Sequence, residues 1–157
     1  MDANIISICE VCGSEELEKV LDLGIHPLCD DLMPIGSATV CNEYPIQVLF
    51  CDKCKTAHQK YQVPKQRLFN KDYHYRARFT SDVLDGMEEL VKSLENNLSV
   101  DLSNKLVVDI GCNDGSLLDI FKLRGCKTVG VEPTGAAMDA ITKKHLIYND
   151  YFTKDLA

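Results

Sequence analysis

The chain has 157 residues, 45% of them hydrophobic and 26% charged, which is the composition of a soluble globular protein. Its formal net charge of −7 argues against a general nucleic-acid-binding surface. No run approaches the roughly 18 consecutive apolar residues of a membrane span, and the first residues lack the basic start and apolar core of a secretory signal. The sequence therefore predicts a cytoplasmic protein without a membrane span, and it leaves the oligomeric state open.

Four of the eight cysteines form two identical pairs, Cys9-x-x-Cys12 and Cys51-x-x-Cys54. In a reducing compartment such pairs are metal ligands more often than they are disulfides. A spacer of two residues lets both sulfurs converge on one side of a tight turn, and two such turns complete a tetrahedral thiolate shell for zinc. Because a closed shell leaves no open coordination position, we expect the zinc to be structural.

Other interpretations of these residues stay open. Paired disulfides or a redox dithiol are the alternative to the metal site, although no thioredoxin-like pattern surrounds either pair. His26 and His58 are alternative ligands, although a histidine on the surface or in a core is the commoner case. The remaining cysteines lack metal-ligand spacing and are expected to be unpaired thiols or small core residues: Cys29, Cys41, Cys112 and Cys126.

Residues 1–63 are predicted to form the zinc-binding module. The segment 44–50 is typical of a strand that leads into the second cysteine pair. A unit of this size lacks enough core to fold strongly alone, so we expect zinc to supply much of its stability.

Residues 64–100 are predicted to form a connector, residues 64–80, and a linking helix. The connector is rich in aromatic and basic side chains, which suits a phosphate-bearing ligand, but a solvated face that covers a domain junction fits equally well. From residue 81 to 98 apolar residues recur at helical spacing, which predicts a helix with one apolar stripe that packs on the following sheet. Thr80 or Ser81 is expected to cap its start.

Residues 101–157 alternate between strand and helix patterns, which predicts an α/β fold with a parallel sheet. Ligands of such sheets bind at the carboxyl ends of the strands. The expected strands are residues 105–110, 128–132 and 146–149, and the expected helices are residues 116–122 and 135–144.

The most informative segment is the loop after the first of these strands, Asp109-Ile110-Gly111-Cys112-Asn113-Asp114-Gly115. A dinucleotide site needs Gly-x-Gly-x-x-Gly, but here Asn113 replaces the second glycine and the Asp114 carboxylate would repel a pyrophosphate. A cationic nucleoside without phosphates, such as S-adenosylmethionine, suits this loop, which resembles the first motif of class I methyltransferases. Glu132 after the next strand is placed to bind a ribose. An ordinary strand, turn and capped helix is the alternative.

Taken in chain order, the motifs resemble those of the zinc-containing sugar C-methyltransferases over nearly the whole chain. The resemblance lies in the cysteine pairs, Leu23-Gly24-x-x-Pro27-Leu28, Phe69-x-x-x-Tyr73-x-Tyr75, the loop at residues 110–115, and Gly130-Val131-Glu132-Pro133-Thr134. One departure is His58-Gln59, where the family usually has a glutamine alone.

The resemblance implies a four-cysteine zinc module followed by the first part of a class I methyltransferase sheet, which is Rossmann-like. It implies an enzyme that removes a proton next to the keto group of a nucleotide-diphosphate keto-deoxysugar, whose enolate then attacks the methyl group of S-adenosylmethionine. The implied cofactor-binding residues are Asp109, Gly111, Asn113, Asp114 and Glu132. The implied substrate-binding residues are Tyr73, Tyr75, Arg76 and Arg78, for which junction packing and solvent exposure are the alternatives.

The resemblance also places the catalytic base and most of the sugar pocket beyond residue 157, because only about three of the seven usual strands are expected here. Two other functions stay open. One is an RNA methyltransferase with a zinc finger, for which the basic connector would contact RNA. The other is a non-catalytic module that folds around zinc and presents half of a nucleotide site to a partner.

Overall fold

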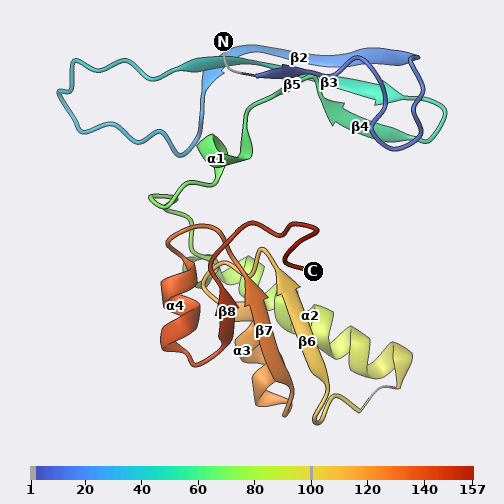
Figure 1. Cartoon of the computed structure of the whole chain (residues 1–157), viewed down its shortest axis with the longest axis vertical. Coiled ribbons are helices and arrows are strands. Elements are labelled where there is room, and N and C mark those ends of the chain that lie inside the picture. The colour runs from blue at the N-terminus through green and yellow to red at the C-terminus, as the bar shows by residue number, and fades with distance from the viewer. Residues whose placement is uncertain (1–2, 100) are drawn as a thin grey trace. The chain divides into compact units, whose positions relative to one another are not determined.

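A computed structural model describes residues 3–99 and 101–157, apart from the side chain of Leu98. The chain divides into two compact units, Met1–Leu68 and Phe69–Ala157, which are shown in Figure 1. Among the described residues, no helix combines the length and the apolar character needed to cross a membrane. The three-part division into residues 1–63, 64–100 and 101–157 stays a prediction about domain organisation.

The N-terminal unit consists of two small antiparallel sheets and a short helix (Figure 1). The predicted strand at residues 44–50 is present and is one residue longer at each end. The three-stranded sheet has the order β2-β3-β4, and β1 pairs with β5. The elements are β1 (Asn4–Ile5), β2 (Leu17–Pro27), β3 (Glu43–Cys51), β4 (Thr56–Gln59), β5 (Tyr61–Gln62) and α1 (Lys65–Leu68).

Strand β2 was not predicted from the sequence, although it has 11 residues. Its pairing with β3 shifts register between Lys19 and Leu21 and again between Asp22 and Ile25. Such bulges interrupt the alternation of inward and outward side chains by which a strand is recognised in a sequence. Almost the whole strand is exposed, so the usual signal of a buried apolar face is missing as well.

The C-terminal unit contains the predicted parallel sheet, with strand order β6-β7-β8, and it confirms the α/β, partially Rossmann-like class (Figure 1). Helix α4 is shorter than predicted; the chain leaves it just before Lys144, whose φ of 63° is left-handed. The elements are η1 (Ala77–Phe79), α2 (Ser81–Leu98), β6 (Leu106–Ile110), α3 (Ser116–Leu123), β7 (Lys127–Val131), α4 (Ala137–Thr142) and β8 (Leu146–Tyr148).

Helix α2 was predicted to pack on the sheet, but it packs mainly against α3, and Val107 of β6 packs against the same apolar cluster. Val91 is fully buried in a cluster with Leu102, Phe121 and Cys126. At the rim, the guanidinium of Arg124 binds the carboxylate of Glu88 at 2.6 Å. The expected side-chain cap is wrong, because Thr80 occupies the capping position without a side-chain hydrogen bond to the helix.

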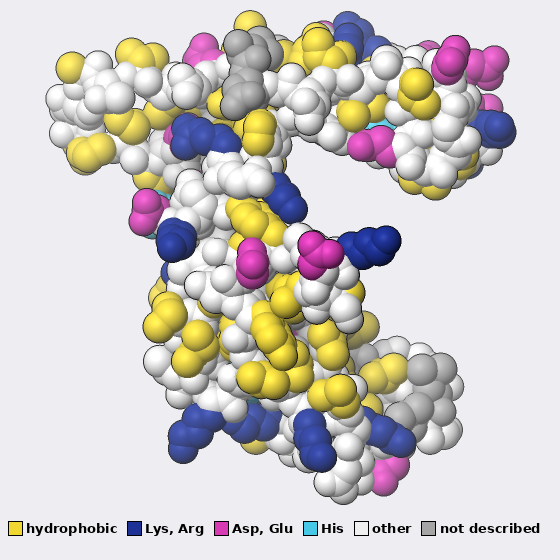
Figure 2. Space-filling model, viewed as in Figure 1, with side chains coloured by type: hydrophobic (Ala, Val, Ile, Leu, Met, Phe, Trp, Pro, Cys, Tyr) yellow, Lys and Arg dark blue, Asp and Glu magenta, His cyan; other side chains and the backbone are white. Residues whose placement is uncertain are grey.

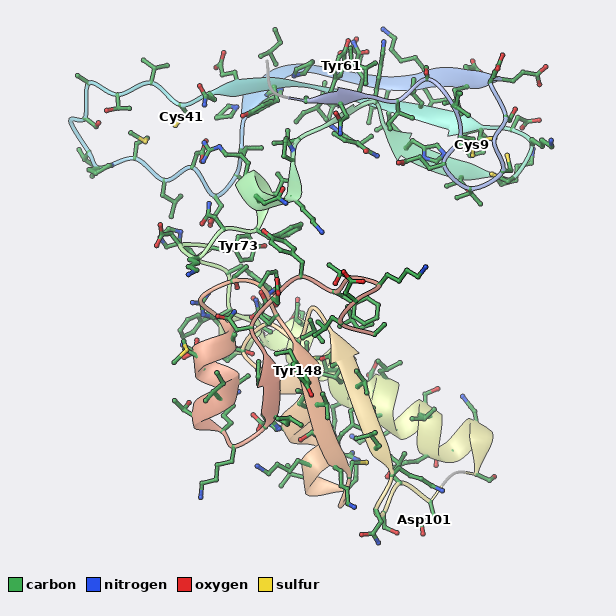
Figure 3. All side chains as sticks on the ribbon, viewed as in Figure 1. Cys9, Cys41, Tyr61, Tyr73, Asp101 and Tyr148 are labelled. Carbon is green, nitrogen blue, oxygen red and sulfur yellow. The ribbon has the colours of Figure 1, made fainter. Side chains whose placement is uncertain are left out.

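One face of the parallel sheet is apolar and exposed. Leu106, Val108 and Ile110 alternate along β6 and are 53–65% exposed, and Leu146 and Tyr148 of β8 are exposed as well. Figure 2 shows hydrophobic side chains gathered over these strands, and Tyr148 is labelled there in Figure 3. Parallel sheets are normally covered on both faces. Val107, which lies between Leu106 and Val108 and therefore points to the opposite face, packs against the apolar cluster of α2 and α3.

Candidate functional site

The four predicted metal-binding cysteines converge in the N-terminal unit. Their Sγ atoms all lie within 4.8 Å of one another, with Cys9 and Cys54 at 3.5 Å and Cys12 and Cys51 at 3.6 Å. A tetrahedral zinc site with Zn–S bonds of about 2.3 Å requires sulfurs roughly 3.8 Å apart. The arrangement therefore fits a four-thiolate zinc site, and among the described residues all eight cysteines are free of disulfides.

The two cysteine turns are built alike, although they come from different parts of the chain. In the first, the amide of Gly13 donates to the carbonyl of Cys9, and Gly13 has a φ of 70°. In the second, Lys55 donates to Cys51 in the same way and has a φ of 58°. Each turn thus spans five residues and ends in a left-handed conformation, which points both sulfurs of a pair to one side. Cys41 lies at the other end of this unit, as Figure 3 shows.

The thiols of the cluster differ in acidity. Hydrogen bonding to the backbone amide of Cys12 is the main cause that lowers the pKa of Cys9 to about 5. The amide of Ser14 acts in the same direction on Cys12, but burial and the three neighbouring cysteine sulfurs raise the pKa of Cys12 to about 12. Four adjacent thiolates repel one another, so a bound cation is needed to keep all of them deprotonated.

His58 lies outside the four-sulfur cluster but touches it. Its Nε2 is 3.2 Å from the Sγ of Cys9, its Nδ1 is 3.6 Å from Glu10, and the residue is only 6% exposed. Contacts of this kind orient metal ligands from outside the first coordination sphere. The Nε2 of His26 instead lies 2.6 Å from the backbone carbonyl of Leu23, outside the cysteine cluster.

A pocket of about 620 Å³ opens in the same unit, and sequence reasoning missed it. Its wall is mostly apolar and comes from strands β1 to β5, helix α1 and neighbouring loops, so no local pattern in the sequence predicts it. The lining includes Leu28, Tyr44, Ile46, Gln59, Tyr61 and Leu68.

In the C-terminal unit, the predicted cofactor loop and Glu132 meet at the carboxyl ends of β6 and β7. Ile110 and Val131 are paired in register, and the next amide, that of Gly111, donates to the carbonyl of Val131 at 2.8 Å. The Oε2 of Glu132 accepts the amide of Asn113 at 2.9 Å, and its Oε1 accepts the amide of Thr134 at 2.9 Å. Glu132 is 5% exposed, and each carboxylate oxygen has a second lone pair for a ligand.

The side chains of Asn113 and Asp114 are engaged by the connector. Asn113 accepts the amide of Ala77 at 3.0 Å through Oδ1 and donates to the carbonyl of Tyr75 at 3.1 Å through Nδ2. Asp114 accepts the amide of Arg78 at 3.0 Å and both the amide and the hydroxyl of Ser116. The sequence did not reveal the contacts with the connector, because their partners are 36 or 38 residues apart.

Two further groups near this edge have shifted acidities. Burial, reinforced by the charge of Glu132, raises the pKa of Asp109. Burial, together with the charges of Asp109 and Glu132, raises the pKa of Cys112 to about 12, so this buried residue is a neutral thiol at pH 7. Acids placed together in this way favour a cation nearby, which would reduce their mutual repulsion.

The predicted substrate residues all lie in the connector. The ring of Tyr73 meets that of Phe69 edge-on, with centroids 5.7 Å apart, and Tyr75 is 42% exposed. Both arginines pair with Asp139 of α4, Arg76 at 2.8 Å and Arg78 at 3.0 Å, and Arg78 also faces Asp114 at 3.5 Å. A phosphate would have to replace these ion pairs. Nothing in the sequence connects Asp139 with the arginines.

Comparison with known proteins supports the motif analysis. Residues 9–69 match the family model Methyltransf_13, which is described as "Putative zinc binding domain". The chain is also 28% identical over 132 residues to the C-methyltransferase NovU of Streptomyces niveus. This alignment covers 82% of the chain and 30% of the relative's length, so the chain spans less than a third of that protein. Residues 9–69 are thus similar to a zinc-binding domain, and the resemblance of the chain to the zinc-containing sugar C-methyltransferases is confirmed.

Proposed function

We propose that this chain forms the zinc-binding and cofactor-binding part of an S-adenosylmethionine-dependent C-methyltransferase. The similarity to a C-methyltransferase supports the reaction class. The observation that carries the cofactor is the hydrogen bond of 2.9 Å between the amide of Asn113 and the carboxylate of Glu132. It joins the glycine loop after β6 to the acid after β7, at the edge where parallel sheets bind nucleosides.

Each proposed cofactor residue has a task that its surroundings allow. Gly111 has a φ of 83°, and a Cβ built on it meets no atom within 4 Å, so the backbone borders open space. Glu132 would bind the ribose hydroxyls through its remaining lone pairs. Asp109 and Glu132 would offer negative charge to a cationic ligand, which would lower the raised pKa of Asp109 again. Bound S-adenosylmethionine would supply an electrophilic methyl group, and the zinc would have a structural task.

The substrate that we propose is a nucleotide-diphosphate keto-deoxysugar, and no residue of this chain is proposed as the catalytic base. Tyr75 is the best placed of the predicted substrate residues, because its ring is exposed while its carbonyl is held by Asn113. The arginines would contribute through their ion pairs with Asp139, which keep residues 76 and 78 in place.

Substitution of Gly111 by alanine tests the cofactor assignment. Gly111 and Gly125 both have a φ of 83°, and a Cβ at Gly125 makes only ordinary contacts with Ser103, at 3.6 and 3.8 Å. Both substitutions should therefore cost a similar backbone strain of roughly 1–2 kcal/mol. Only Gly111→Ala places a methyl group at the carboxyl edge, and we expect it to weaken binding of S-adenosylhomocysteine at least about tenfold.

Isothermal titration calorimetry with S-adenosylhomocysteine measures this difference, and thermal unfolding of both variants verifies that their stabilities match. Gly125 lies in the turn between α3 and β7, away from the carboxyl ends, so Gly125→Ala should bind like the wild type. Equal affinities of the two variants would remove Gly111 from the site. Absence of binding to the wild-type chain would contradict the cofactor assignment itself.

A further inference from the structure

The connector is attached to all three loops that follow the strands of the parallel sheet. After β6, the side chains of Asn113 and Asp114 accept backbone amides of the connector. After β7, the amide of Gly135 donates to the carbonyl of Lys71 at 3.1 Å. After β8, the hydroxyl of Tyr151 donates to the carbonyl of Phe69 at 2.8 Å. Residues 69–78 therefore run along the carboxyl edge of the sheet, where a ligand of this fold would bind.

The contacts of Asn113 are specific to its side chain and to its backbone conformation. Its amide group bonds the carbonyl of Tyr75 and the amide of Ala77 at once, in the way one peptide group pairs with another. Its φ of 50° is left-handed, a conformation that asparagine tolerates better than most residues. A residue with a shorter or apolar side chain would leave both backbone groups of the connector without this partner.

Asp114 adds a second attachment, which is inaccessible to solvent. The residue is fully buried, and one carboxylate oxygen accepts the amide of Arg78 while the other accepts the amide and hydroxyl of Ser116 at the start of α3. Burial opposes the charge, but the hydrogen bonds from Ser116 and Arg78 outweigh it and keep the pKa of Asp114 below its usual value.

The same loop is held from its other side by Glu132, which accepts the backbone amide of Asn113. Asn113 thus lies between the acid proposed for the ribose and the backbone of the connector. We propose that Asn113 and Asp114 are positioning residues that fix residues 75–78 to the cofactor loop, so that ligand binding at the carboxyl edge and ordering of the connector are coupled. The identity of the ligand, but not the attachment itself, rests on the proposed function.

The coupling has a direct consequence for Tyr75. A ligand that orders the loop at residues 111–113 also orders the side chain of Asn113, which binds the carbonyl of Tyr75. By thermodynamic reciprocity, an ordered connector increases the affinity of the loop for the ligand. Loop and connector would therefore become ordered together, which would place the exposed Tyr75 ring before a second substrate arrives.

The substitution Asn113→Gly tests the proposal in the whole chain. Glycine accepts the left-handed backbone and removes only the two side-chain hydrogen bonds. Asn104→Gly is the matched control, because Asn104 has a φ of 60° and lies before β6, at the opposite end of the strand. Without ligand, we expect hydrogen exchange at the amides of Ala77 and Arg78, followed by NMR, to be roughly tenfold faster in Asn113→Gly and unchanged in Asn104→Gly.

Saturation with S-adenosylhomocysteine provides the second readout. In the wild type it should slow exchange at Ala77 and Arg78, whereas in Asn113→Gly it should slow exchange in the loop but not in the connector, and its affinity should be roughly tenfold lower. If the wild type binds the ligand while connector exchange is the same in both proteins, the proposal is wrong and the cofactor assignment stands. If Asn113→Gly accelerates connector exchange but the wild type binds no ligand, the attachment stands, whereas the cofactor assignment and the coupling to it are wrong.

Discussion

Removal of zinc is expected to unfold the N-terminal unit and to leave the C-terminal unit folded. Among the described residues of the N-terminal unit few apolar side chains are buried, and two of them are cysteines of the cluster: Cys9, Tyr44, Leu49 and Cys51. A structural zinc contributes on the order of 10 kcal/mol or more to such a site, which exceeds what two buried side chains provide. The C-terminal unit has a separate core around Val91 and does not depend on the metal.

Hydrogen exchange followed by mass spectrometry, before and after treatment with a chelator, measures this result segment by segment. Elemental analysis should find one zinc per chain. Cys51→Ser should reproduce the effect of the chelator, because Cys51 is completely buried in the cluster, whereas Cys29→Ser is the control, because Cys29 is exposed and outside it. Protection of strands β2 to β4 that persists without metal would refute a structural role for zinc.

Leu118→Ala is expected to destabilise the C-terminal unit by roughly 2–5 kcal/mol. Leu118 lies on α3, is completely buried, and faces β7, since a Cβ built on Gly130 would come within 3.0 Å of its Cδ1. Truncation therefore leaves a cavity between helix and sheet, which surrounding atoms fill only in part. Few single substitutions outside the metal site remove as much buried apolar volume.

Leu123→Ala is the matched control for this substitution. It makes the same chemical change on the same helix, but Leu123 is 85% exposed. The free energy of unfolding of the C-terminal unit should therefore change by less than about 0.5 kcal/mol. Urea unfolding, monitored by hydrogen exchange in β6 to β8, yields the two free energies of unfolding. A similar cost for both substitutions would show that α3 does not pack as described.

The segments predicted correctly are those whose signal is local. The spacing of each cysteine pair brings two sulfurs to one side of a turn whatever the rest of the chain does, so the metal ligands were accessible from the sequence. The order of strands and helices after residue 105 follows from apolar runs and glycine turns, and the parallel sheet β6-β7-β8 confirms it. Strand β2 was not predicted because its two bulges interrupt the alternation of inward and outward side chains from which a strand is predicted.

The environment of the predicted site residues could not be derived in this way. Arg76 pairs with Asp139, 63 residues away, and Asn113 binds Ala77, 36 residues away. Neither pairing produces a periodic pattern in the sequence. The sequence indicated that Asn113 and Asp114 suit a cationic nucleoside. The structure shows their side chains bound to the connector, which makes the cofactor contacts of these two residues a prediction that calorimetry must test.

The amino-acid sequence by itself thus predicted the cluster of four cysteines, the α/β class and the loop at residues 109–115, because spacing and periodicity act between near neighbours. Only the tertiary structure decided what that loop holds. Hydrogen bonds between distant segments depend on how the strands align, and alignment brings Glu132, Asn113 and the backbone at Ala77 into one line of contacts. These contacts join the loop at residues 109–115 to Glu132 on one side and to the connector on the other.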